Sequence, residues 1–542
     1  MQTAPIIPRV GQYTLCEGAA FKVPARLACY GVAQGGAWEV FCLRMRALVG
    51  VTASLCDKHA DSLLCVTQGG AALSVGAYSI SVCETQITGT YSNAESLHSL
   101  FTSLFALFFA ARDSRAIAAC RIEDAPQYCH RGLMIDTARH YFSIAELERV
   151  AEQMSLCKLN VLHWHLTDDQ AWRFESKAYP RLTDEGAFYT QEEIRDFVVF
   201  CAKRGITIQP EIEVPGHSTA CLRAYPALTC AGEAPEKAPA MGITSVILCA
   251  GKAETIRFLQ TILDELCALF PGETIHLGGD EAPKTAWEAC PHCAKKREEQ
   301  GLRDCEEQQA WLTNTLADYL KAKGRRVICW NESAKAANLH SEIALQYWME
   351  MEPESYCLPQ LLGERHAVYS AVNANYFDYP PCLVPLRATY GYVPEVRGQS
   401  MADAIGTQGI EAAIWTERVE TGETLEKAIF PRVQALSEAA WSGGGDFADF
   451  IRRLQDYLPL LEAVGVAYTP LAEAQLTDEA RIECAAAFLT QFFGAIAASG
   501  AKAADMPAPP MALLQMMVGM FFPPALAPQV TERLRALLPQ MQ

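Results

Sequence analysis

Short apolar runs alternate with longer amphipathic segments between residues 128 and 445. Eight of the apolar runs have the length and composition of buried strands: 132–136, 161–165, 207–213, 274–279, 327–331, 344–348, 367–373 and 412–416. Segments with helical spacing follow most of them, as at 143–156, 191–204 and 309–323. Strands that alternate with helices indicate a parallel sheet, and eight such units suit a closed barrel. The sequence therefore predicts an α/β fold whose main domain is a (β/α)8 TIM barrel.

Two smaller regions flank the predicted barrel, which we assign to residues 126–445. Residues 1–125 mix strand-like runs (38–43, 63–67 and 78–82) with an apolar helical run (96–111), which predicts an N-terminal α+β domain. Residues 446–542 predict a C-terminal helical region. Within it, the Ala- and Pro-rich stretch 499–510 suggests a linker, and the Met-rich run 511–522 is either core or the contact of a homodimer.

Composition narrows the function classes. The net charge of −18 argues against general binding to nucleic acid or to an anionic membrane surface. Six prolines interrupt the uncharged segment 506–530, so it falls short of the roughly 20 apolar residues of a membrane span. The odd count of 21 cysteines predicts free thiols, and no secretory signal is visible at the start. We expect a cytoplasmic protein; secretion would require a signal that preceded this sequence.

Polar and aromatic residues stand at the C-terminal ends of the predicted strands, where (β/α)8 barrels carry their active sites. They are Asp136, His163, His165, Glu211, Glu213, Asp280, Glu281, Trp330, Trp348, Asn373, Trp415 and Glu417. The most informative stretch is HLGGDE at 276–281, in which an apolar strand runs into two glycines and two adjacent carboxylates. Paired acids supply a proton donor and a group that stabilises positive charge, as the cleavage of a sugar bond requires.

Five segments resemble the motifs of glycoside hydrolase family 20, the β-N-acetylhexosaminidases. They are RGLMIDTARHY at 131–141, HWHLTDDQ at 163–170, PEIEVPGH at 210–217, HLGGDE at 276–281 and WTE at 415–417. The resemblance covers the barrel and extends to the N-terminal domain, but it does not explain the C-terminal helices. It implies an exo-acting retaining enzyme that removes terminal β-linked GlcNAc or GalNAc from an oligosaccharide or glycoconjugate.

The resemblance also implies a mechanism in which the 2-acetamido oxygen of the substrate attacks the anomeric carbon. Glu281 would be the general acid and then the base, and Asp280 would hold the acetamido N–H and help to keep Glu281 protonated. Tyr376 would donate a hydrogen bond to the acetamido oxygen. No cofactor and no catalytic metal is implied.

Eight further residues acquire substrate-binding roles from the resemblance. Trp330, Trp348 and Trp415 would wall the acetamido methyl and stack on the sugar face. Arg139, Asp378 and Glu417 would bind the hydroxyls at positions 3, 4 and 6. Asp168 and His217 would orient Glu281 and tune its proton affinity.

Several neighbouring residues receive a structural interpretation instead. We expect Arg131 to form a structural ion pair, and His163 and His165 are left outside the site as core histidines. Glu211 and Glu213 receive supporting roles, with Glu213 the closer neighbour of the site. Where the family often has Trp-Asp-Glu, this chain has Trp330, Asn331 and Glu332.

Other functions stay open at this point. Within the family, a lacto-N-biosidase or a 6-sulfo-GlcNAc hydrolase is an alternative, although a carboxylate at Asp378 would repel a sulfate group. A metal-dependent barrel hydrolase could use His163, His165, His217 and Asp280, and a sugar-binding protein without catalysis is a further class. Cys290 and Cys293 have the spacing of half a zinc site, with Cys305 nearby, but a complete site needs four ligands.

Overall fold

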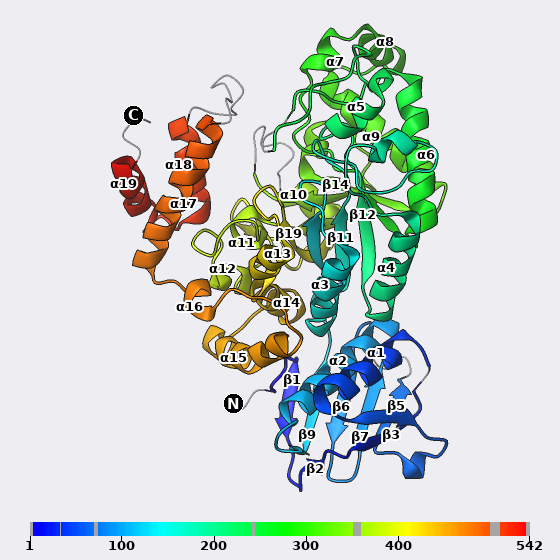
Figure 1. The fold of residues 1–542 in the computed structure, drawn as a ribbon, viewed down its shortest axis with the longest axis vertical. Helices are drawn as coiled ribbons and strands as arrows, with labels where there is room; N and C mark the ends of the chain where they lie inside the picture. The colour runs from blue at the N-terminus through cyan, green and yellow to red at the C-terminus, as the bar shows by residue number, and fades with distance from the viewer. Residues whose placement is uncertain are drawn as a thin grey trace.

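The computed structural model describes residues 4–32, 34–69, 74–240, 244–350, 359–498 and 510–537. Figure 1 shows three parts: an N-terminal sheet domain, a central barrel and a group of C-terminal helices beside the barrel. Most of the stretch 499–510, for which the sequence suggests a linker, lies outside the described residues. The predicted fold class, an α/β TIM barrel with an N-terminal α+β domain and C-terminal helices, is confirmed.

Eight parallel strands close the barrel in sequence order, and β19 pairs with β10 to complete it. They are β10 (His130–Asp136), β11 (Val161–His165), β12 (Thr207–Glu211), β13 (Thr274–His276), β14 (Arg326–Trp330), β15 (Ala344–Tyr347), β16 (Ala367–Tyr369) and β19 (Thr407–Ile414). Each overlaps one of the eight predicted runs. The last strand begins five residues before its predicted start at 412, because polar residues at its entrance still pair with β10 and β16.

Helices on the outside of the barrel connect these strands. The main ones are α3 (Ile144–Leu156), α4 (Gln191–Lys203), α5 (Thr219–Ala224), α6 (Ala253–Leu269), α7 (Thr285–Ala289), α8 (Pro291–Gln300), α9 (Cys305–Lys321), α10 (Pro359–Glu364), α11 (Val372–Asn375), α12 (Leu386–Tyr390), α13 (Gly422–Ile429) and α14 (Arg432–Ser442). A capping box starts α3, where Ser143 and Glu146 satisfy each other's backbone N–H groups. The same S/T-x-x-E pattern, Thr190 with Glu193, starts α4. Between α12 and β19, β17 (Glu395–Val396) and β18 (Gln399–Ser400) form a small antiparallel ribbon.

The N-terminal domain is a seven-stranded mixed sheet in the order β1-β9-β6-β7-β5-β3-β4. Its strands are β1 (Gln12–Leu15), β3 (Arg26–Tyr30), β4 (Thr52–Leu55), β5 (Leu64–Gln68), β6 (Tyr78–Val82), β7 (Ile87–Tyr91) and β9 (Cys120–Asp124), with a small pair β2 (Phe21–Lys22) and β8 (Ala116–Ile117). Helices α1 (Gly36–Arg44) and α2 (Ala94–Ala110) pack together between the sheet and the barrel (Figure 1).

One predicted strand in this domain is wrong. The run 38–43 is part of α1, not a strand, because Trp38 and Phe41 recur at helical spacing and pack together on Phe101 of α2. A short apolar run has no periodicity strong enough to separate the two possibilities. The predicted structural ion pair of Arg131 is confirmed: its Nη2 lies 2.6 Å from Oε1 of Glu95, which joins α2 to the barrel.

In the described part of the chain after the barrel there are five helices: α15 (Phe447–Ala463), α16 (Leu471–Ala474), α17 (Asp478–Ala498), α18 (Pro510–Phe521) and α19 (Ala527–Leu537). Within the Met-rich run, Met517, Phe521 and Phe522 are buried together with Leu489 of α17, whereas Met516 is exposed. This hydrophobic cluster also includes Tyr376 of the barrel. The C-terminal helices therefore pack onto the side of the barrel that carries a predicted site residue.

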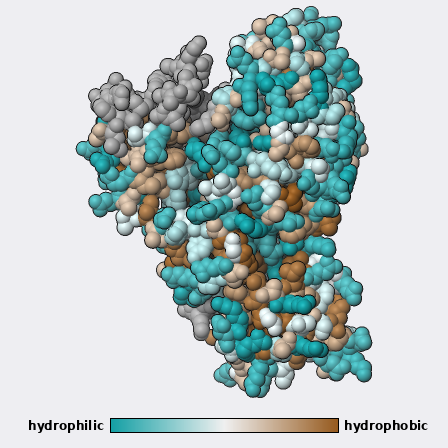
Figure 2. Space-filling view, viewed as in Figure 1, coloured by the Kyte–Doolittle hydropathy of each residue, from teal (hydrophilic) through white to brown (hydrophobic). Residues whose placement is uncertain are grey.

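On the face drawn in Figure 2, hydrophilic side chains cover the end of the barrel near α7 and α8, and hydrophobic ones gather toward the junction with the N-terminal domain. No helix within the described ranges is long and apolar enough to cross a bilayer. Of the cysteines, the 20 that the structure describes are free, as the sequence predicts.

Candidate active site

The loop after β13 carries the paired carboxylates. Gly278 and Gly279 have φ of 60° and 101°, in the region that favours glycine. A Cβ on Gly278 would lie 1.9 Å from Oε2 of Glu213, and one on Gly279 would lie 2.1 Å from Oγ of Ser333. The two glycines therefore let the loop turn tightly over neighbouring side chains, and Asp280 and Glu281 follow directly at the C-terminal mouth of the barrel.

Asp280 and Glu281 differ in exposure although they are adjacent. The side chain of Asp280 is 11% exposed and that of Glu281 is 34% exposed. The Nε2 atom of His217 lies 3.7 Å from a carboxylate oxygen of each. One imidazole nitrogen is thus equally close to a nearly buried carboxyl and to a carboxyl that solvent reaches, as expected of groups with different tasks.

Glu332 completes this group and was missed by the sequence reasoning. Its Oε2 accepts a 3.0 Å hydrogen bond from the backbone N–H of Glu281, which has a φ of 43°. The sequence does carry a signal for Glu332, because residues 330–332 keep the glutamate of the family's Trp-Asp-Glu motif.

Burial raises the pKa of both catalytic candidates. It is the main reason why the pKa of Asp280 rises to about 7, and the charges of Glu281 and Glu332 add to it against the opposing effect of His217. Burial also raises the pKa of Glu281, and Glu332 again contributes in the same direction. A raised pKa favours the protonated form of a carboxyl, which is the form that donates a proton.

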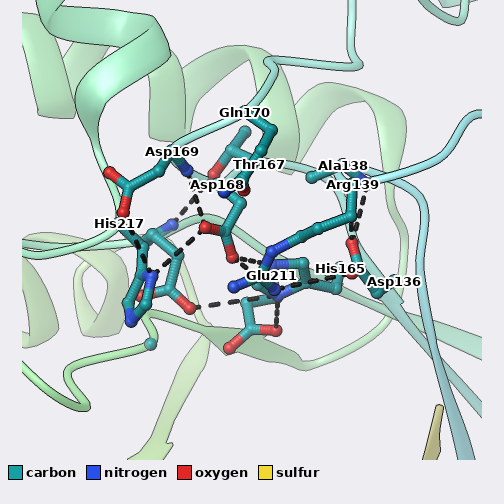
Figure 3. A network of polar contacts seen from close by, with 12 residues as sticks. Asp136, Ala138, Arg139, His165, Thr167, Asp168, Asp169, Gln170, Glu211 and His217 are labelled. Atoms are coloured by element: carbon teal, nitrogen blue, oxygen red, sulfur yellow. Dashed lines mark hydrogen bonds and ion pairs between the residues drawn. The ribbon is translucent and has the colours of Figure 1, made fainter. Parts of the chain in front are cut away.

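Arg139, Asp168 and His217 form an ion-pair network beside these carboxyls (Figure 3). The Nη1 atom of Arg139 lies 2.7 Å from Oδ2 of Asp168, and Nδ1 of His217 lies 3.1 Å from Oδ1 of the same carboxylate. His165 donates from Nε2 to Oδ2 of Asp168 at 2.8 Å and from Nδ1 to Glu211. Asp168 is therefore the point at which three cationic side chains meet.

The charges in this network stabilise one another. Burial would raise the pKa of the Asp168 carboxyl, but Arg139 and His217 hold it well below its usual range. Burial likewise opposes the charge on His217, yet Asp168 keeps the pKa of that imidazole well above its usual value. His217 is thus positively charged in the ligand-free protein, with its Nε2 side facing Asp280 and Glu281.

Arg139 also connects the network to Glu417 and Trp415. Its Nη2 lies 3.9 Å from Oε1 of Glu417, and its guanidinium lies 5.0 Å from the centre of the Trp415 ring. Its Nε has no hydrogen-bond partner among the described residues. A buried cation with an unused donor next to a partly exposed carboxylate can bind a polyhydroxylated ligand.

Four aromatic rings lie at the ends of β14, β15 and β19 and in the loop after β16. Trp330 is 1% exposed, its Nε1 donates to Oε1 of Glu211 at 2.9 Å, and its ring centre lies 5.9 Å from that of Trp415. Trp348 and Tyr376 are nearly parallel, at 17°, with their ring centres 6.1 Å apart. The structure therefore brings the three tryptophans and Tyr376 together in two pairs, and Trp330 is the most enclosed of them.

Asp378 lies two residues beyond Tyr376, against an arginine from the β19 side. Oδ2 of Asp378 is 3.4 Å from Nη2 of Arg418, while Oδ1 is buried without a partner among the described residues. The guanidinium of Arg418 also lies 5.3 Å from the ring of Phe488 in α17. Burial raises the pKa of Asp378 to about 7, and Arg418 opposes that rise. The C-terminal helices thus reach this end of the site through Arg418.

Beneath the site, Glu211 occupies the interior of the barrel. His163, His165 and His276 all contact its carboxylate, and His163 also hydrogen-bonds to Glu411 at 2.8 Å. The four residues of the metal-dependent alternative therefore divide: His163 and His165 contact Glu211, whereas His217 faces Asp280. Ligand atoms of His217, Asp280 and Glu281 do lie within 4.8 Å of one another.

The profile described as "Glycosyl hydrolase family 20, catalytic domain" matches residues 128–444. A beta-hexosaminidase of Porphyromonas gingivalis is 33% identical over 383 residues, which cover 66% of this chain and 49% of that protein. A beta-hexosaminidase of Vibrio furnissii is 31% identical over 398 residues, covering 67% of this chain and 65% of that protein. The chain thus spans about half of the first relative and just under two thirds of the second.

A solved structure agrees with these matches. The GH20 exo-β-N-acetylglucosaminidase of Vibrio harveyi in complex with N-acetylglucosamine superposes with a TM-score of 0.76 at 26% identity, covering 87% of this chain and 79% of that one. Fold, site and relatives together define a barrel glycoside hydrolase. More specifically, the chain belongs to glycosyl hydrolase family 20.

Proposed function

We propose that this protein is an exo-acting, retaining β-N-acetylhexosaminidase that removes terminal β-linked GlcNAc or GalNAc through an oxazolinium intermediate. The observation that carries the proposal is the pair Asp280 and Glu281, one nearly buried and one partly exposed, each with a carboxylate oxygen 3.7 Å from the imidazole Nε2 of His217. The relatives named beta-hexosaminidase and the N-acetylglucosamine complex from Vibrio harveyi support the same substrate class.

In the first step, Glu281 donates its proton to the glycosidic oxygen as the bond from that oxygen to C1 breaks. The acetamido oxygen of the substrate attacks C1 and forms the oxazolinium ring. The exposure of Glu281 allows it to meet a leaving group that extends into solvent, and burial, which raises its pKa, favours the protonated form that donates.

Asp280 supports the acetamido group during this attack. Its Oδ1 is buried and has no partner among the described residues, so it is free to accept the acetamido N–H. That hydrogen bond and the positive charge of the ring both favour the carboxylate form, so substrate would lower the raised pKa of Asp280. Tyr376 would donate to the acetamido oxygen and hold it in line with C1.

In the second step, water attacks C1 and the bond from C1 to the former acetamido oxygen of the oxazolinium breaks. Glu281, now ionised, accepts a proton from the water, and the acetamido group is restored with the β configuration retained. Arg139, Asp378 and Glu417 would bind the hydroxyls of the terminal sugar. Trp330, Trp348 and Trp415 would enclose its acetamido methyl and apolar face, which favours exo cleavage.

The test compares aryl β-glycosides of GlcNAc, GalNAc and glucose with the wild type and two variants. We expect release from the N-acetyl sugars only, because glucose has no acetamido group. Glu281→Gln and Asp280→Asn should each lower turnover by about 10²–10⁴-fold. Glu288→Gln, at an exposed carboxylate on α7 a few residues away, is the control and should keep wild-type activity.

Leaving-group dependence separates the two roles. A dinitrophenyl leaving group needs little protonation, so Glu281→Gln should lose far less activity on that substrate than on a p-nitrophenyl one. Asp280→Asn should lose the same factor on both. Turnover of aryl glucoside at a comparable rate would overturn acetamido participation. Silence on all three sugars would overturn the proposal in favour of a disaccharide-releasing enzyme, a 6-sulfo-GlcNAc hydrolase or a binding protein, which a glycan panel separates.

A further inference from the structure

Four cysteines converge beside the loops of the candidate active site. Cys230 and Cys249 lie in the connection between β12 and α6, and Cys290 and Cys293 begin α8. Their four Sγ atoms lie within 4.8 Å of one another. The Sγ of Cys249 is 3.8 Å from that of Cys290 and 3.6 Å from that of Cys293, and Cys230 and Cys293 are 4.0 Å apart.

These spacings match a tetrahedron of thiolates. Zinc–sulfur bonds of about 2.3 Å in tetrahedral geometry place the sulfur atoms about 3.8 Å apart. Sulfur atoms in a disulfide are only about 2.05 Å apart. The observed spacings of 3.6–4.0 Å therefore correspond to four ligands around one ion rather than to two cystines.

The backbone is shaped to bring the two pairs together. A Cβ on Gly251 would lie 2.2 Å from the carbonyl carbon of His292, so only glycine allows the segment of Cys249 to touch the turn between Cys290 and Cys293. Lys252 holds the other side, because its Nζ donates to the carbonyl oxygens of Ala227 and Thr229. Segments about 40 and 60 residues apart in the chain are thus packed around the four sulfur atoms.

We propose that Cys230, Cys249, Cys290 and Cys293 bind one structural zinc ion as four thiolates. Cys249, Cys290 and Cys293 are at most 4% exposed, and four protein ligands leave no open position, so the ion would take no part in catalysis. Cys305, which lies near Cys290 and Cys293 in the sequence, is instead 3.2 Å from Nη1 of Arg297 and lies outside the cluster. The proposal does not depend on the proposed activity.

The ion would fasten together two connections that carry site residues. His217 precedes Cys230 in the connection after β12, and Glu281 precedes Cys290 in the connection after β13. The hydrogen bond from Nε1 of Trp287 to the carbonyl oxygen of Leu248, at 2.9 Å, also joins the two connections near this point. A zinc ion between them would keep the imidazole of His217 and the carboxyl of Glu281 in register.

The first experiment measures metal content in the full chain, purified without chelators and under reducing conditions, by inductively coupled plasma mass spectrometry. We expect about one zinc per chain. Cys249→Ser and Cys293→Ser should each lose the zinc, whereas Cys305→Ser, at a buried cysteine outside the cluster, should retain it. A protein grown with cobalt in place of zinc should show the visible bands of tetrahedral cobalt–thiolate coordination.

A second measurement keeps the test valid if the serine variants fail to fold. Titration of the wild type with an organomercurial should release zinc to a colorimetric chelator, with release complete only when the cluster thiols have reacted. A chain that contains no metal, contains iron in place of zinc, or has these cysteines as disulfides by mass spectrometry would overturn the assignment. So would a folded Cys249→Ser variant that keeps one zinc per chain.

Discussion

The carboxylate of Glu332 accepts a hydrogen bond from the backbone N–H of Glu281, with 3.0 Å between the two atoms. Glu281 has a φ of 43°, which is unfavourable for a residue with a side chain. Glu332 is itself nearly buried, and its Oε1 has no partner among the described residues. The hydrogen bond therefore holds the proposed catalytic acid in a conformation that it would not adopt by itself.

Glu332→Gln should move the pH dependence of activity. The amide oxygen can still accept the hydrogen bond, but the negative charge that raises the pKa of Glu281 and of Asp280 is gone. The pKa of the catalytic acid then falls, so the alkaline limb of kcat/KM should shift to lower pH. Glu332→Ala also loses the acceptor and should lower kcat further. An unchanged alkaline limb in Glu332→Gln, with Glu288→Gln as the control, would contradict this role.

Asp280→Asn should stabilise the ligand-free protein as the pH rises. The pKa of Asp280 is 3.8 without its surroundings and about 7 in the fold. Below about pH 4 the carboxyl is protonated in both states, so the variant gains nothing there. Between pH 4 and 7 the unfolded chain releases this proton more readily than the folded one, which destabilises the wild type by up to about 4 kcal/mol.

The measurement is the difference in Tm between Asp280→Asn and the wild type at a series of pH values. It should grow from pH 4 to pH 7 and then level off. Asp113→Asn, at a side chain that is 90% exposed, should give a constant difference. A Tm difference for Asp280→Asn that shrinks toward pH 7 would mean that the buried carboxyl is ionised and paired in the folded state.

Gly278→Ala should disrupt the site much more than Gly301→Ala. The two glycines have nearly the same φ, 60° and 66°, so the backbone penalty of about 1 kcal/mol is shared. At Gly278 the new methyl would overlap the Glu213 carboxylate, whereas nothing lies within 4 Å at Gly301. We expect Gly278→Ala to lose activity and several degrees of Tm, and Gly301→Ala to keep its activity. Equal losses in the two variants would mean that φ, and not the contact with Glu213, decides the outcome.

Arg418→Met should weaken substrate binding more than turnover. Arg418 lowers the pKa of Asp378, which burial raises to about 7, so removal of the guanidinium raises that pKa further. Asp378 would then be neutral at pH 7 and a poorer acceptor for sugar hydroxyls. KM should rise about tenfold, with part of the loss recovered at higher pH, where Asp378 ionises again.

Phe488→Leu is the matched control for this change. It keeps the packing of α17 and the charge of Arg418 but removes the ring 5.3 Å from the guanidinium. A small KM effect in Phe488→Leu together with a large one in Arg418→Met would assign the effect to charge. If Arg418→Met lowered kcat and left KM unchanged, the charge of Arg418 would not act on substrate binding through Asp378.

The alternation of strands and helices by itself determined the barrel. Eight apolar runs at strand length, separated by helices, leave few other ways to bury both faces of a parallel sheet. The pattern also predicted that the C-terminal ends of the strands lie at one rim of the barrel. Residues as distant in the sequence as Arg139, Asp280 and Trp415 could therefore be assigned to one site. The pattern was weakest for the short run 38–43, where five apolar residues and one glutamate are compatible with either a strand or a helix.

Only the tertiary structure decided which buried charged groups and which thiols come into contact. Glu332 reaches Glu281 across two loops, and Cys230 and Cys249 join Cys290 and Cys293 from a different connection. His165, interpreted from the sequence as a core residue, donates to Asp168 and so belongs to the ion-pair network of the site. Periodicity reports which side of an element faces inward, but it carries no information on which groups meet there. The close approach of distant loops sets those contacts, and with them the raised pKa values of Asp280 and Glu281.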